Sequence, residues 1–154
     1  MIKDYIQARP ISSNTMQVLG PRQTAKRTAS NGTDNERFGR AFAISNNTVI
    51  VGAWQDYNIN GYLSGSAYIF KKNAGIWTEV TKLSTSDGGA NFDPLGWSVA
   101  ISGSTAIVGV RHDDDNGTNS GSAYIYKEIA GTWTQTAKLN ASDGASNDRF
   151  GQSV

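Results

Sequence analysis

Residues 37–53 read RFGRAFAISNNTVIVGA, and residues 65–72 read GSAYIFKK after a polar loop. The same order returns from Pro94 onward, so that Phe38-Gly39 corresponds to Leu95-Gly96 and then to Phe150-Gly151. The repeat period is therefore 57 and then 55 residues. A period of this length, built from short strand-like runs, indicates one supersecondary unit per copy. Such a unit depends on neighbouring copies to bury its faces.

Composition excludes several classes of protein. The chain has 154 residues, of which 38% are hydrophobic, and this is enough for a globular core. Its net charge of +1 gives no overall field toward nucleic acid, and its apolar runs are too short to insert into a membrane. The absence of cysteine excludes disulfides and thiol chemistry, and the N-terminus does not resemble a secretory signal.

Each copy contains four apolar runs separated by turn residues, which predicts four antiparallel strands. Asn46-Asn47 suits a type I′ turn between the first two runs, and Gly103-Ser104 suits a type II′ turn at the same place in the next copy. The predicted strands are residues 41–45, 48–53, 65–70 and 76–83 in the first copy and 98–102, 105–110, 121–126 and 132–139 in the second.

The character of these strands changes along the unit. The first is rich in small residues, the next two are apolar on both faces, and the fourth alternates like a half-exposed strand. In the fourth strand we expect Trp133, Ala137 and Leu139 on one face and Lys138 with the threonines on the other. Trp77 recurs as Trp133 and is interpreted as packing. This order predicts an all-β fold of four-stranded antiparallel propeller blades.

The repeated motifs resemble the FG-GAP repeat family, in particular bacterial relatives of the integrin alpha-chain β-propeller. Phe38-Gly39 and Phe150-Gly151 match the FG element, whereas Leu95 replaces the Phe in the middle copy. Val51-Gly52-Ala53 and Val108-Gly109-Val110 match the GAP-like segment, although no Pro follows either. The resemblance covers roughly residues 23–154 and implies a ring of about seven blades.

The repeat register predicts the organisation of the chain. Residues 1–22 fit no repeat and are expected to be a poorly ordered leader or a replaced piece of a blade. Residues 23–30 match residues 135–142, which predicts the outer strand of a preceding blade. About two complete blades with partial blades at each end cannot close a ring. We therefore expect either a fragment of a longer protein or a unit that self-associates through open strand edges. The predicted segments are 1–22 leader, 23–36 outer strand and loop, 37–93 first blade, 94–148 second blade and 149–154 first strand of a following blade.

The alternating strand directions place the short hairpins at one end of each blade and the long loops at the other. We define the long-loop end as the rim, and it is the candidate binding surface because loops on a rigid scaffold commonly carry function. The candidate ligand-binding residues on the rim are Trp54, Tyr57, Tyr62, Arg111 and His112.

Two rim loops carry candidate calcium ligands. Asp56, Asn58 and Asn60 precede Gly61 in the spacing that opens a calcium loop, and Asp113 and Asp115 begin the equivalent loop. Ala67 stands where such a loop places its bidentate Glu, and the second loop is one residue short. The alternative is a polar turn in which Asp and Asn bond their own backbone. The integrin relatives bind calcium in the hairpin between the first two strands, which here is a two-residue turn with no room for a cation.

No catalytic motif is present, and His112 is the only histidine. We therefore predict a non-enzymatic binding or adhesion module that presents its rim to a protein or carbohydrate. The alternatives are a purely architectural repeat of a larger surface protein and a non-catalytic part of a propeller hydrolase or lyase. The resemblance implies an extracellular or cell-surface location.

Overall fold

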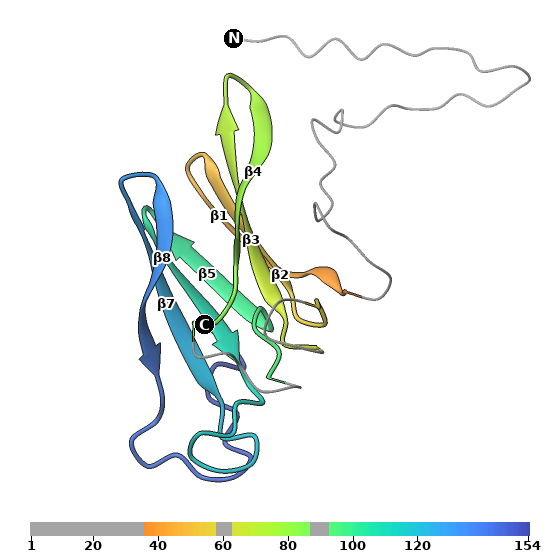
Figure 1. The fold of residues 1–154 in the computed structure, drawn as a ribbon, viewed down its shortest axis with the longest axis vertical. Coiled ribbons are helices and arrows are strands. Elements are labelled where there is room, and N and C mark those ends of the chain that lie inside the picture. Colours follow the sequence, from red (N-terminus) through yellow and green to blue (C-terminus); the bar gives the residue numbers. More distant parts are fainter. Residues whose placement is uncertain (1–35, 58–62, 87–92) are drawn as a thin grey trace, which may run out of the picture.

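The computed structural model describes residues 36–57, 63–86 and 93–154, which form two four-stranded antiparallel sheets (Figure 1). The strand order is sequential in each sheet, and the sheets are not closed into a ring. The prediction of an all-β fold with four-stranded propeller-type blades is confirmed. The strands of the first sheet are β1 (Phe38–Ser45), β2 (Thr48–Ala53), β3 (Ser66–Asn73) and β4 (Ile76–Leu83), and those of the second are β5 (Ser98–Ser102), β6 (Thr105–Val110), β7 (Ser122–Ile129) and β8 (Thr132–Leu139).

Three predicted segments need separate comment. The predicted leader and the outer strand within residues 23–36 lie outside the described residues, apart from Glu36. Residues 149–154 form no strand. Instead, Phe150 makes a parallel bridge to Gly121, as Leu95 does to Gly65. Within the described ranges, no helix is long and apolar enough to cross a membrane.

The hairpin turns differ from the prediction at one place. Gly103 has a positive φ of 55° and Ser104 does not, which fits the expected type II′ pattern. Asn46 likewise has a φ of 53°, whereas Asn47 is not in the left-handed region. A type I′ turn needs positive φ at both central residues, so the prediction of type I′ for Asn46-Asn47 is wrong. Asn can replace Gly at this place because its short polar side chain tolerates the left-handed conformation.

A β-bulge interrupts the outer strand of each sheet and reverses its alternation. Ile125 pairs with Ala137 while Tyr126 pairs with Gln135, so Thr136 is the extra residue. Val80 is the extra residue at the same position in β4. Because side chains alternate every residue along a strand, one extra residue turns the following side chains to the other face. Lys138 therefore lies on the face of Tyr124, and the prediction that it points outward with the threonines is wrong.

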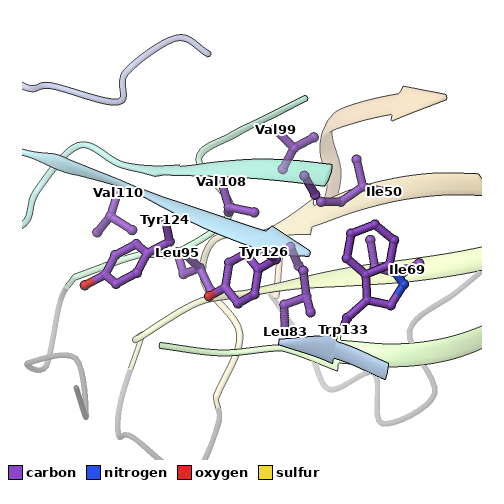
Figure 2. Packing of buried hydrophobic residues seen from close by; sticks show 12 residues of the cluster. Ile50, Ile69, Leu83, Leu95, Val99, Val108, Val110, Tyr124, Tyr126 and Trp133 are labelled. Atoms are coloured by element: carbon purple, nitrogen blue, oxygen red, sulfur yellow. The ribbon is translucent and has the colours of Figure 1, made fainter. Parts of the chain in front are cut away.

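The main hydrophobic core lies between the two sheets (Figure 2). Strand β5 packs against β1 and β2 there. The core joins large side chains of the second sheet to Ile50, Ile69 and Leu83 of the first, and it includes Trp133, as expected for a packing residue. The contributions from the second sheet include Val99, Val108, Val110, Tyr124 and Tyr126. Two polar contacts flank this core: the Tyr126 hydroxyl donates to the Ser84 carbonyl at 2.9 Å, and Lys71 forms an ion pair with Glu128.

Glycines mark the place where one blade begins against the preceding one. Gly96 has a φ of 92°, and a Cβ at this position would overlap the Ser66 carbonyl oxygen. A Cβ at Gly52 would overlap the carbonyl oxygen of Gly96, and one at Gly65 would overlap that of Leu95. We call this three-glycine contact the glycine crossing. It recurs as Gly109, Gly121 and Gly151 at the end of the second sheet.

The glycine crossing predicts a difference between two glycine substitutions with similar backbone conformations. Gly75 has a φ of 83° in the β3–β4 turn and open space around its Cα. We expect Gly75→Ala to lower the free energy of unfolding by about 1–2 kcal/mol through backbone strain alone. Gly96→Ala adds overpacking against the neighbouring blade and should cost at least about 2 kcal/mol more. Urea denaturation of both variants measures the difference, and equal losses would contradict a role of the crossing in packing.

Candidate functional site

The short hairpins and the long loops lie at opposite ends of both sheets, as expected (Figure 1). Among the predicted rim residues, Trp54 follows β2, Arg111 and His112 follow β6, and Tyr57 lies exposed in the loop after Trp54. Tyr62, Asn58 and Asn60 lie outside the described residues. The rim loops thus bring described candidates from both sheets to the same end.

Four side chains from the two sheets meet at the junction between the blades. The indole rings of Trp54 and Trp97 pack edge to face with centroids 4.9 Å apart. The Arg111 guanidinium carbon lies 3.4 Å from the centroid of the Trp97 ring, and that of Arg40 lies 3.8 Å from it. We call these four residues the arginine–tryptophan cluster. Each arginine gains a cation–π interaction with the electron-rich face of an indole.

The repeat register explains why these residues meet. Arg40 and Trp97 each follow the glycine of the FG element in successive copies, and Trp54 and Arg111 each follow the GAP-like segment. Packing of one blade on the next brings the start of β5 against the end of β2. Arg40 and Trp97, which hold the same position in successive copies but differ in residue type, therefore become neighbours.

The cluster is partly buried, and burial shapes its electrostatics. Burial lowers the pKa of Arg111, and the positive charges of Arg149 and Arg40 lower it further. The His112 ring stacks on Trp97 at 6.0 Å between centroids. Burial and the charges of Arg111 and Arg149 lower the pKa of His112, although Asp114 opposes this shift. His112 is thus mainly neutral at pH 7.

Two nitrogens of the cluster are buried without an acceptor. Trp54 Nε1 and Arg111 Nε have less than 1 Å² of exposed surface and no hydrogen-bond partner. Buried polar groups are normally hydrogen-bonded, so such groups call for an explanation. Stacking on Trp97 partly explains the burial of Arg111 Nε, because the indole ring covers one face of the guanidinium group.

The predicted calcium ligand Asp56 is fully buried and already faces a cation. Its Oδ2 lies 2.6 Å from Lys82 Nζ and accepts a hydrogen bond from the Tyr68 hydroxyl at 3.1 Å. Burial and the adjacent carboxylate raise the pKa of Tyr68, which keeps its hydroxyl protonated as a donor. The Asp56 carboxylate is thus neutralised by a lysine.

Asp113 occupies the equivalent position in the second sheet. Its Oδ2 lies 2.9 Å from Lys138 Nζ and accepts from the Ser122 hydroxyl at 2.7 Å, with the Tyr124 hydroxyl at 3.4 Å. Lys138 also pairs with Asp115 at 2.6 Å. Hydrogen bonds from Lys138 and Asn140 are the main causes that lower the pKa of Asp115.

The Asp–Tyr–Lys arrangement was missed by the sequence analysis, which placed Lys138 on the solvent face. One signal could have indicated it, because the set Asp56, Tyr68, Lys82 returns as Asp113, Tyr124, Lys138 at nearly the same spacing. No group of three or more His, Cys, Asp or Glu side chains that could hold a metal ion is found among the described residues.

The chain matches a known protein-family model. A model of the FG-GAP repeat matches residues 21–70, 77–126 and 133–154. The second match begins in β4 of the first sheet and ends in β7 of the second, so the family's sequence unit spans a blade junction. A search of curated proteins gave no match.

The lysines of the Asp–Tyr–Lys sets should be required for stability. Lys82→Met leaves the Asp56 carboxylate buried without a cation, and breaking such a pair costs about 3 kcal/mol or more. Lys72→Met, which removes an exposed charge from β3, is the control and should change stability by less than about 0.5 kcal/mol.

Thermal unfolding of the wild type and both variants, in calcium and in a chelator, measures this. Because lysine already neutralises Asp56, the wild-type midpoint should be the same in both buffers. A midpoint raised by calcium in the wild type would show that the rim binds the metal. Equal effects of the two substitutions would contradict the structural role of Lys82.

Proposed function

Because this chain belongs to the FG-GAP repeat family, we propose that it is a non-enzymatic binding or adhesion module whose rim contacts a protein or carbohydrate. The observation that carries the proposal is the arginine–tryptophan cluster, which gathers Arg40, Trp54, Trp97 and Arg111 at the loop end of the blade junction. Tryptophan, tyrosine and arginine are the residues most enriched where proteins bind partners.

The proposed location is extracellular or at the cell surface, which is typical of the family. Calcium binding by the loops that begin at Asp56 and Asp113 stays a prediction from the sequence. The lysine ion pairs argue against it, and the chelator comparison above tests it. A purely architectural role is the second candidate, because the Asp–Tyr–Lys sets use rim acids for internal ion pairs. The third, a non-catalytic part of a hydrolase or lyase, has no described residue in its favour.

Arrays of glycans and proteins probed with the full chain test the binding role. We expect at least one specific ligand, with binding reduced at least about 10-fold in Trp54→Ala. Ile76→Ala is the control, since Ile76 is 65% exposed at the hairpin end. Matching unfolding midpoints would show that both variants fold. Absence of any ligand, or binding unaffected by Trp54→Ala, would favour the architectural role.

We further propose that another blade or a second copy of the chain covers the open face of the first sheet. Phe42 of β1 is 72% exposed, whereas Val99, at the same position of β5, is 8% exposed in the inter-sheet core. Ile44 is exposed in the same way, while its equivalent Ile101 packs against that core. No described residue covers Phe42 as the first sheet covers Val99.

Size-exclusion chromatography with light scattering tests self-association. We expect a mass above the 16.5 kDa of one chain at high concentration. Phe42→Asp should shift the protein to the monomer because it places a charge on the apolar face, whereas Ile129→Asp, at the exposed end of β7, should not. A mass of one chain at every concentration would contradict association through this face.

A further inference from the structure

We propose that Arg40 and Arg111 form a binding site for the carboxylate or sulfate groups of an acidic polysaccharide. This inference rests on the proposed function, since it names the ligand class for the same rim. It goes further because it assigns the recognition to a charge, whereas a carbohydrate ligand in general could be neutral.

The geometry of stacking leaves the arginines available to a ligand. A guanidinium group that lies on an indole uses its flat face, and its N–H bonds lie in the plane and point away from the ring. Arg40 and Arg111 both stack on Trp97 in this way, at 3.8 Å and 3.4 Å. Within the described part of the chain, no carboxylate forms an ion pair with either guanidinium group. Arg40 is exposed, whereas Arg111 Nε is buried, so an anion would be bound by the Arg40 guanidinium group and the terminal nitrogens of Arg111. The planar fork of arginine is well suited to this.

Charge repulsion supports the same assignment. Arg40 and Arg111 contact one ring, and Arg149 is close enough to lower the pKa of Arg111 together with Arg40. Holding like charges together on a partly buried ring is unfavourable unless an anion lies nearby. Asp114, the described acid that interacts with His112, uses its Oδ1 to accept from the Asn119 backbone at 2.6 Å. A bound anionic group would offset the repulsion between the arginines, which Asp114 does not remove.

The surrounding residues favour a sugar over other anions. Trp54 is partly exposed although its Nε1 is buried, and Tyr57 is 49% exposed in the adjoining loop. Aromatic side chains offer an apolar face to the C–H groups of a sugar ring. Nucleic acid is disfavoured because its binding uses a basic patch or stripe, whereas the proposed site consists of a few arginines at one blade junction in a chain of net charge +1.

The test uses the full chain with three immobilised polysaccharides and one peptide. These are polygalacturonate, chondroitin sulfate, neutral dextran and poly-glutamate, with affinity measured at several salt concentrations. We expect binding to one or both acidic polysaccharides, none to dextran, and an affinity that falls as salt rises. Arg40→Gln together with Arg111→Gln should weaken binding at least about 10-fold, since a hydrogen bond to a charged group contributes about 1.5–3 kcal/mol.

Lys72→Gln, which removes one charge from the hairpin half of β3, is the control and should change the affinity by less than about 2-fold. Arg111→Lys keeps the charge and loses the planar fork, so an intermediate loss would support recognition by the fork. If the double variant unfolds, the salt dependence of the wild type still decides, because an affinity independent of salt would overturn the proposal.

The remaining outcomes separate this inference from the proposed function. Equal binding of poly-glutamate would overturn the assignment to a polysaccharide. Binding of dextran alone, or of a neutral array ligand, would overturn the anion site and leave the binding module intact. If neither these polymers nor the arrays give a ligand, the proposed function itself fails.

Discussion

The glycine crossing is the constraint on which the rest of the structure depends. Gly52, Gly65 and Gly96 bring three backbone segments closer than any side chain would allow, and the contact recurs one repeat later. This approach sets the position of each blade against the preceding one. The two sheets can then bury Ile50, Val108 and their neighbours in a shared core. It also gives a physical reason for the glycines of the FG and GAP-like elements, which otherwise are only a sequence pattern.

The glycine crossing repeats from blade to blade, whereas the residues beside it differ in type. Arg40 and Trp97, which follow the FG glycine in the two described blades, meet at the blade junction. Gln152 follows the third FG glycine. Backbone contacts hold the second and third of these glycines, Gly96 and Gly151, and the residue that follows the FG glycine differs between copies. The chemistry of each junction is therefore carried by residues that do not repeat.

The sequence predicted the strands well because their apolar runs and turn residues are local signals. It failed where the structure depends on an interaction between strands. The bulges at Val80 and Thr136 are not visible in a period-two pattern, so Lys138 was assigned to the solvent face. Trp54, Arg111 and His112 were identified as rim residues. Their contacts with Trp97 and Arg40 depend on how one sheet packs on the next, which no single repeat specifies.

The two kinds of charge on the rim differ in how they are balanced. The acids that repeat, Asp56 and Asp113, lie buried and are neutralised by lysines from the outer strands. The arginines that do not repeat stack on tryptophan. The indole ring supplies no counter-ion, so the positive charge of each arginine is not neutralised. A rim rich in acidic residues can thus be locally positive at the blade junction. Net charge and residue counts hide this, because the paired acids contribute to the total but little to the field that a ligand meets.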